Sequence, residues 1–180
     1  MPSINFNYIE RTINHFNCKN DFINFVETGT WRGDTIFEVE PYFENLYTIE
    51  IKEDLYNNVK KLYNGNKINF ILGDSSFELE NVCKILKDNT IFFLDGHFSA
   101  DDTGRGIKDC PLYEELESIN KYFKNTGIII IDDMRLMGNI YSDIDRDNIL
   151  KILQDRIISY TYMESVIVEN DRLIIYIKNI

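Results

Sequence analysis

Cysteine, histidine, proline and tryptophan are all scarce in this chain of 180 residues, which contains three Cys, two His, three Pro and one Trp. The cysteines, Cys18, Cys83 and Cys110, are scattered, so they form neither a disulfide framework nor a paired metal-binding motif. We interpret them as reduced thiols and expect a cytoplasmic location.

Basic residues are outnumbered, with 19 Lys and Arg against 30 Asp and Glu, and the formal net charge is -11. Nucleic acids and anionic membranes bind clustered Lys and Arg, so we expect neither as a partner. Long apolar runs are lacking too, and none reaches the length that spans a bilayer. The first ten residues, MPSINFNYIE, do not have the basic and then apolar pattern of a signal peptide.

What the chain does have is a regular alternation of buried-strand and amphipathic-helix patterns. Five apolar runs are typical of buried parallel strands, at 23–28, 46–51, 68–74, 90–96 and 127–132. Segments with helical spacing separate or flank them, at 1–20, 34–43, 53–63, 75–87, 111–123 and 142–157. Near the C-terminus, 165–170 and 172–178 predict two strands around an Asn170-Asp171 turn.

This order predicts one α/β domain over residues 1–180, a doubly wound Rossmann-like sheet of about seven strands with a C-terminal antiparallel hairpin. Ligands bind such sheets at the carboxyl ends of the strands. All five predicted parallel strands end in carboxylates, which are Glu27, Glu50, Asp74, Asp95 and the pair Asp132-Asp133. Helix capping is an alternative explanation for Asp74-Ser75-Ser76 and for Asp132-Asp133.

The loop after the first strand indicates the class of ligand. Its pattern is E-x-G-x-x-x-G, from Glu27 through Gly29 to Gly33, and not the G-x-G-x-x-G of dinucleotide sites. A carboxylate aimed at this crevice repels phosphate and favours a cationic ligand. A nicotinamide oxidoreductase with the same kind of sheet is therefore kept only as an alternative.

This loop, with Glu50 and Asp74 at the next two strand ends, resembles the S-adenosylmethionine site of class I methyltransferases. The resemblance implies that the strand-1 acid Glu27 and the glycine loop hold the methionine part of the cofactor. It also implies that Glu50 binds the ribose hydroxyls and that Asp74 and Ser75 meet the adenine. The implied cofactor residues are Glu27, Thr28, Gly29, Thr30, Gly33, Thr35, Glu50, Ile51, Asp74, Ser75, Ser76 and Asp95.

The segments FLDGH and IIIDDM resemble the metal-dependent macrocin-type and cephalosporin-hydroxylase-like sugar O-methyltransferases. That resemblance implies that Asp95, Asp132 and Asp133 bind Mg²⁺ or Mn²⁺. It also implies methyl transfer to a hydroxyl of a small molecule, with a sugar or nucleotide-linked sugar as the favoured acceptor. A metal would lower the high pKa of such a hydroxyl. A metal-independent small-molecule methyltransferase and a non-catalytic subunit with this fold remain alternatives.

His97 departs from the macrocin-type pattern, which has an Asp, assigned as the general base, two residues after the strand-4 acid. We expect His97 to be the catalytic base beside Asp95. A fourth metal ligand and a polar residue of a lid are its alternatives. His15 is interpreted as a surface residue.

Residues 97–110 form a polar segment that we expect to be a loop on the acceptor side, with a plain surface loop as the alternative. Within it Arg105 is expected to contact an acceptor phosphate. Trp31 and Arg32 are expected to contact the acceptor as well, although Trp31 plugging the helix–sheet junction fits equally. The chain is short for this family, so a homodimer whose second subunit completes the acceptor site is a further expectation.

Overall fold

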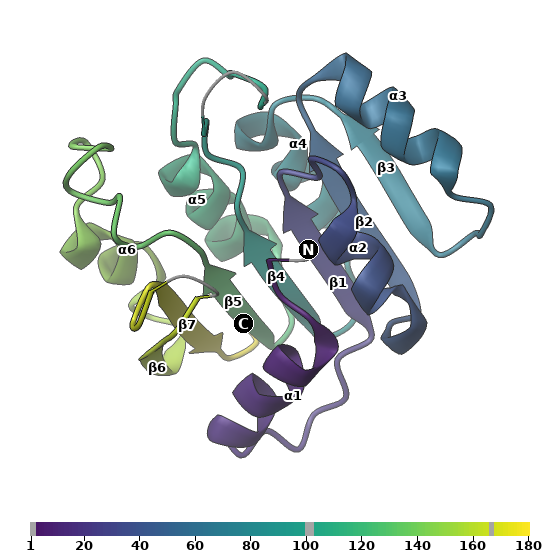
Figure 1. Ribbon diagram of the computed structural model, residues 1–180. Helices are drawn as coiled ribbons and strands as arrows, with labels where there is room; N and C mark the ends of the chain where they lie inside the picture. The colour runs from purple at the N-terminus through teal and green to yellow at the C-terminus, as the bar shows by residue number, and fades with distance from the viewer. Residues whose placement is uncertain (1–2, 100–102, 166–167) are drawn as a thin grey trace.

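The computed structural model describes residues 3–99, 103–165 and 168–180. Within these ranges seven strands form one mixed sheet in the order β3-β2-β1-β4-β5-β7-β6 (Figure 1). Strands β1 to β5 are parallel, and β7 runs antiparallel to both β5 and β6. The strands are β1 (Asn24–Thr28), β2 (Asn45–Glu50), β3 (Ile68–Leu72), β4 (Thr90–Leu94), β5 (Gly127–Ile131), β6 (Ile157–Met163) and β7 (Arg172–Ile177). The predicted α/β fold with a C-terminal antiparallel strand pair is confirmed.

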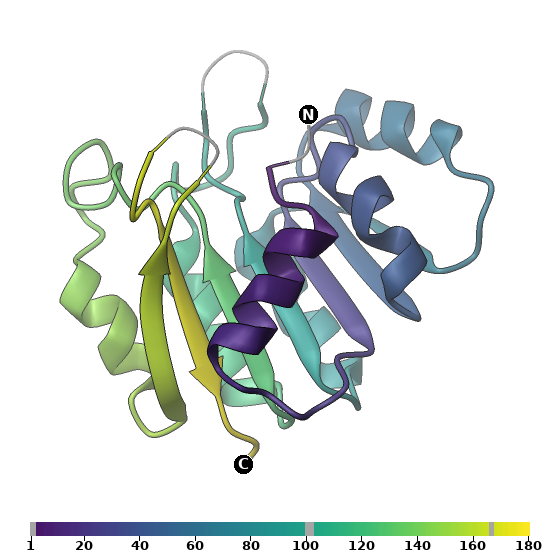
Figure 2. The ribbon, with the colours of Figure 1, turned by 60° about the horizontal axis from the view of Figure 1, so that its bottom comes forward.

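Helices cover both faces of the sheet (Figures 1 and 2). The α-helices that precede β3 lie over one face of the sheet, and those that follow β3 lie over the other face. They are α1 (Phe6–His15), α2 (Asp34–Val39), the short 3-10 helix η1 (Glu40–Tyr42), α3 (Glu53–Leu62), α4 (Ser75–Ile85), α5 (Leu112–Tyr122) and α6 (Arg146–Leu153). None of the described helices is long and apolar enough to cross a membrane.

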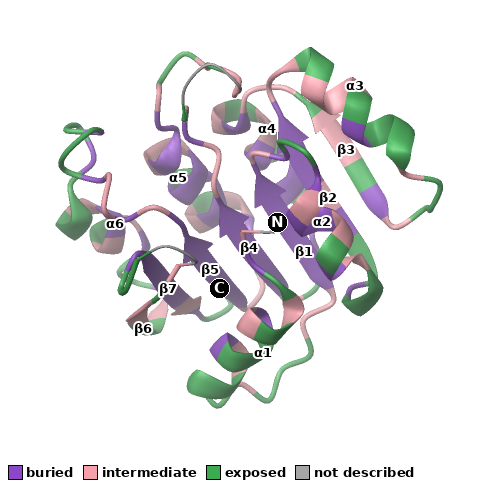
Figure 3. Cartoon of the chain, in the orientation of Figure 1, coloured by how far each residue is buried: buried purple, intermediate pink, exposed green. Residues whose placement is uncertain are grey.

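The central strands are buried on both faces, as the purple centre of Figure 3 shows. Successive side chains of a strand point to opposite faces. Phe25 therefore packs under α1 and α2, whereas Val26 packs under the helices of the other face. In β4, Ile91 packs on the same face as Phe25, and Phe92 packs on the same face as Val26. This double burial explains why these strands have continuous apolar sequences and do not alternate with polar residues.

The predicted location of the sixth strand was wrong. The strand expected at 165–170 is absent from its described positions, and residues 166–167 lie outside the described ranges. Instead β6 begins at Ile157, inside the segment expected to be helical, because α6 already ends at Leu153. The sequence IISYTYM of β6 is rich in β-branched and aromatic residues, which pack well on a sheet.

The strand order places one crevice at the centre of the sheet. From β1 the chain proceeds to β2 on one side, and β4 later pairs with β1 on the other side. Crossover connections leave this point in opposite directions, so the carboxyl ends of β1 and β4 border a gap between loops. Gly29 follows β1 there, and Asp95 follows β4.

Candidate functional site

A cavity of about 410 Å³ opens at this carboxyl edge. Most of the residues expected to bind a ligand lie in its lining, namely Gly29, Thr30, Trp31, Thr35, Glu50, Ile51, Asp74, Ser75, Asp95, His97 and Asp133. The others do not line it, namely Glu27, Thr28, Arg32, Gly33, Ser76, Arg105 and Asp132. The cavity volume lies within the range that holds a cofactor or a drug-sized ligand.

The glycine loop is folded tightly against the tip of β4. Gly29 has a φ of 82°, and a Cβ at this position would collide with the carbonyl oxygen of Asp95. Gly33 has a φ of 78° immediately before α2. Both positions therefore favour glycine on backbone grounds. Trp31 also has a positive φ, of 47°, which is uncommon for a bulky residue and is typical of functional loops.

The Glu50 carboxylate is fixed at the end of β2 by two backbone hydrogen bonds. The Trp31 N–H donates to Oε2 at 2.8 Å, and the Lys52 N–H donates to Oε1 at 2.9 Å. Glu50 is buried and lines the cavity. A carboxylate oxygen accepts more than one hydrogen bond, so this side chain can still accept from a ligand.

Asp74 combines the two roles that its sequence position suggested. It caps α4, where its Oδ1 accepts hydrogen bonds from the Ser76 N–H at 2.9 Å and the Ser76 hydroxyl at 2.6 Å. It also lines the cavity, and its Oδ2 accepts the Ile107 N–H at 3.2 Å. A Cβ on Gly104 would collide with Ile51. The described part of the 97–110 segment therefore lies over the ends of β2 and β3, whereas Asp101 and Asp102 fall outside the described residues.

Of the four residues expected to contact the acceptor, Trp31 and His97 line the cavity, whereas Arg32 and Arg105 lie outside it. Arg105 is exposed and forms a bidentate ion pair with Asp109, with N–O distances of 2.6 and 3.0 Å. The Arg32 guanidinium carbon lies 4.3 Å from the centre of the Trp31 ring. Trp31 is 37% exposed and lines the cavity, so it does not plug the helix–sheet junction.

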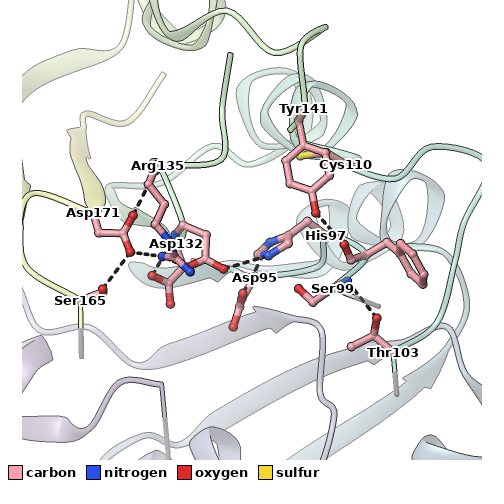
Figure 4. A network of polar contacts seen from close by, with 12 residues as sticks. Asp95, His97, Ser99, Thr103, Cys110, Asp132, Arg135, Tyr141, Ser165 and Asp171 are labelled. Atoms are coloured by element: carbon pink, nitrogen blue, oxygen red, sulfur yellow. Dashed lines mark hydrogen bonds and ion pairs between the residues drawn. The ribbon is translucent and has the colours of Figure 1, made fainter. Parts of the chain in front are cut away.

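His97 is the centre of a compact acidic cluster (Figure 4). Its Nε2 lies 2.9 Å from Asp133 Oδ2, and its Nδ1 lies 3.6 Å from Asp95 Oδ1. Burial lowers the pKa of His97, but Asp133 and Asp95 outweigh this effect and raise it above its usual value. Burial raises the pKa of Asp95 to about 7. The Tyr141 ring packs edge-on against the imidazole, and the Tyr141 hydroxyl donates to the Phe98 carbonyl.

Two arginines, Arg135 and Arg172, pair with acids of this region, and the sequence did not predict these pairs. Arg172 forms a buried bidentate pair with Asp132, with N–O distances of 2.9 and 3.0 Å. Arg135 contacts both Asp133 Oδ1 and the buried Asp171 Oδ2. The only signal for these pairs was an arginine two residues after Asp133 and another at the start of the last strand. The charge repulsion that suggested a cation is thus partly relieved by the chain itself.

Two sets of described side chains bring three ligand atoms within 4.8 Å of one another. One set is Asp95, His97 and Asp133, and the other replaces the first two with Asp132 and Asp171. The second set is already paired with arginines. Of the three expected metal ligands, the structure therefore brings Asp95 and Asp133 together around His97, and turns Asp132 toward Arg172.

Several polar residues lie directly behind the cavity. Thr28 Oγ1 accepts the Asp95 N–H at 3.3 Å. Glu115, which the sequence did not single out, is buried behind Gly96, and this burial raises its pKa to about 7. Burial raises the pKa of Glu27 to about 8. These groups support the walls of the cavity without lining it.

A scan against models of protein families gives no match. A search of curated proteins likewise finds no relative. Solved structures do resemble the chain. The N-methyltransferase NodS from Bradyrhizobium japonicum, in complex with S-adenosyl-L-homocysteine, has a TM-score of 0.58 at 12% identity, over 97% of this chain and 88% of that one. The chain has the fold of class I methyltransferases.

Two further structures support this assignment of the fold. The MycE methyltransferase of mycinamycin biosynthesis, in complex with Mg and S-adenosyl-L-homocysteine, has a TM-score of 0.59 at 13% identity, over 96% of this chain and 49% of that one. A putative caffeoyl-CoA O-methyltransferase from Staphylococcus aureus has a TM-score of 0.55 at 19% identity, over 96% and 82%. These neighbours include both N- and O-methyltransferases, so they do not specify the methylated atom.

Proposed function

We propose that this protein transfers a methyl group from S-adenosylmethionine to a hydroxyl group of a small molecule, assisted by a divalent cation. The observation that carries the proposal is the cavity at the ends of β1, β2 and β4. It combines a glycine loop that tolerates no Cβ at Gly29 with the fixed carboxylate of Glu50.

The charge of the cavity lining supports this cofactor. Among the described residues that line it, five are acidic, Asp34, Glu50, Asp74, Asp95 and Asp133, and Lys108 is the one lysine or arginine. Lys108 is itself paired with Glu114. S-adenosylmethionine carries a sulfonium and an ammonium group, which such a lining attracts, whereas it repels the pyrophosphate of a nicotinamide dinucleotide.

Asp95, His97 and Asp133 fit a divalent cation. Their ligand atoms converge, and His97 Nε2 is buried without an aligned hydrogen bond among the described residues, although Asp133 Oδ2 is only 2.9 Å away. We propose that Asp95 and Asp133 hold Mg²⁺ or Mn²⁺ and that Asp132, held by Arg172, stays outside. When bound, the cation would lower the pKa of a hydroxyl group next to it.

The side chains themselves would position the acceptor and remove its proton. His97 lines the cavity, and its Nε2 lies 2.9 Å from Asp133 Oδ2. We assign His97 the role of general base, with Asp95 beside it. Glu50, Asp74 and Ser75 would bind the nucleoside part of the cofactor. Thr30 and Thr35 would bind its methionine part.

A sugar is the acceptor that we favour. The exposed Trp31 ring at the cavity offers an apolar face to a sugar ring, and hydroxyl groups could reach the acidic cluster. The structure supports a nucleotide-linked sugar less than a free sugar, because few basic side chains are available for its phosphates. Arg105 is paired outside the cavity, and Lys108 is the one lysine or arginine in the described lining.

The proposal is tested by incubating the protein with S-adenosylmethionine, Mg²⁺ or Mn²⁺, and a panel of free sugars, nucleotide sugars and simple amines. Mass spectrometry should detect S-adenosylhomocysteine together with a hydroxyl-methylated sugar. Methylation of the amines alone would replace the O-methylation part of the proposal with N-methylation.

A further inference from the structure

Glu27 does not reach the cavity, yet a chain of hydrogen bonds connects it to the cavity wall. The Thr48 hydroxyl donates to Glu27 Oε1 at 2.7 Å. Thr48 Oγ1 lies 2.5 Å from Thr30 Oγ1, and Thr30 belongs to the glycine loop. Glu27 and Thr48 are register neighbours on β1 and β2, and all three side chains are buried. The chain therefore runs from inside the sheet to the loop.

We propose that Glu27 is a positioning residue that holds the glycine loop in place through Thr48 and Thr30, without touching the cofactor. The inference rests on the proposed function, because the proposed function makes the glycine loop part of the cofactor site. It differs from the expectation that the strand-1 acid binds the methionine part directly.

The loop needs such an anchor, because its conformation is unfavourable by itself. Trp31 adopts a left-handed backbone conformation in the middle of it, and such a conformation persists only when its surroundings hold it. Thr30 anchors the loop from below through Thr48, and the Trp31 N–H anchors it at Glu50 Oε2. The two anchors act on successive residues, so together they fix the part of the loop that lines the cavity.

The surroundings of Glu27 are consistent with an uncharged carboxyl group. The side chain is 1% exposed, and no ion pair to it occurs among the described residues. The acidic groups that act on it are Asp95 from the end of β4 and Glu50 from β2, and both disfavour its ionisation. A neutral carboxyl group can serve as a hydrogen-bond acceptor for Thr48 at this site, and so can the amide oxygen of a glutamine.

The test uses four substitutions and two measurements. Glu27→Gln and Thr48→Ser keep the hydrogen-bond chain, whereas Glu27→Ala and Thr48→Val break it. The first measurement is calorimetric titration with S-adenosylhomocysteine. The second is the fluorescence of Trp31 and its quenching by acrylamide, which reports only on this loop because the chain contains one tryptophan.

We expect Glu27→Ala and Thr48→Val to weaken S-adenosylhomocysteine binding about tenfold and to increase quenching of Trp31. Glu27→Gln and Thr48→Ser should resemble the wild type in both measurements. Thr90→Val serves as the control, because Thr90 is a buried strand threonine far from the loop, bonded to Asp88 and Asn24. It should change neither measurement, and circular dichroism checks that each variant is folded.

Two results would overturn the inference. If folded Thr48→Val keeps wild-type affinity and quenching, the chain does not hold the loop. If Glu27→Gln binds as poorly as Glu27→Ala, the charge of Glu27 acts on the cofactor directly. If the wild type itself binds no S-adenosylhomocysteine, the proposed function fails, but the quenching of Trp31 in Thr48→Val still decides the inference.

Discussion

His97 lies between Asp95 and Asp133, with one ring nitrogen facing each carboxylate, at 3.6 Å and 2.9 Å respectively. The three residues meet because β4 and β5 are parallel neighbours, so their carboxyl ends lie side by side. Asp133 has a φ of 55°, a left-handed conformation that is uncommon outside glycine. Backbone conformations of this kind cluster at functional sites, so the conformation of Asp133 supports the choice of this cluster as a candidate site.

Replacing the imidazole tests the role of His97. We expect His97→Ala to lower the rate of methyl transfer by about 10²–10⁴ while leaving the affinity for S-adenosylhomocysteine unchanged. The physical reason is that we assign His97 to the acceptor, whereas Glu50 is the residue that we assign to the cofactor. Single-turnover kinetics and calorimetry measure the two quantities. A rate close to that of the wild type would reduce His97 to a packing residue and move the base to another acid.

Binding of Mn²⁺ tests the metal ligands independently of catalysis. We expect Asp95→Asn and Asp133→Asn to abolish an electron paramagnetic resonance signal of bound Mn²⁺. Asp132→Asn should retain that signal, because both Asp132 oxygens accept hydrogen bonds from Arg172. His97→Ala distinguishes the two roles of the imidazole, since loss of Mn²⁺ binding would make it a ligand. Binding that survives in both aspartate variants would place the cation elsewhere.

The buried carboxyl of Glu27 should make stability depend on pH. Its pKa is raised from 4.5 to about 8 in the folded protein, so the folded state binds more protons than the unfolded state between these values. Its contribution to stability is therefore fully present below about pH 4.5, declines as the pH rises, and is lost above about pH 8.

Glu27→Gln removes this dependence, whereas Glu115 titrates in both proteins. Denaturant unfolding should show the stability of Glu27→Gln rising relative to the wild type from pH 5 to pH 8, by roughly 3–4 kcal/mol. A constant difference over this range would mean that Glu27 is ionised in the folded protein.

The pair Arg172–Asp132 should matter more for stability than the pair Arg105–Asp109. Both side chains of the first pair are more than nine-tenths buried, so Arg172→Met leaves an unpaired buried charge and should cost about 3–5 kcal/mol. Arg105→Met removes a solvent-exposed pair and should leave stability nearly unchanged. Urea unfolding of the two variants measures the difference. Equal losses would contradict the burial of Asp132.

The sheet could be predicted from the sequence because burial on both faces leaves a direct record in it. The continuous apolar runs located β1 to β5 to within about two residues. They failed at β6, where an apolar helix and an apolar strand follow each other without a glycine or proline between them. Periodicity alone does not separate two such elements, and the boundary depends on Arg156, whose buried side chain donates to the carbonyls at the end of α5.

The sequence predicted which residues lie at the candidate site, because they stand at strand ends. It did not predict which side chains pair with one another. Glu50, Asp74, Asp95 and His97 line one cavity because Glu50 ends a parallel strand and the other three come shortly after one. Which acid meets which base depends on side-chain directions after the strand has ended, so an arginine at the start of the last strand did not by itself identify Arg172 as the partner of Asp132. The acceptor contact expected of Arg105 stays a prediction, and the structure pairs Arg105 with Asp109, four residues along the same loop. Cytoplasmic location and a homodimer stay predictions.

The central claim, that the cavity binds S-adenosylmethionine through Glu50, is tested most directly by calorimetric titration with S-adenosylhomocysteine. The wild type and Glu53→Ala, which removes an exposed acid of α3, should bind it equally. Folded Glu50→Ala should lose about 1.5–3 kcal/mol of binding free energy, the value of one hydrogen bond to a charged group. No binding by the wild type, or unchanged affinity in Glu50→Ala, would contradict the account.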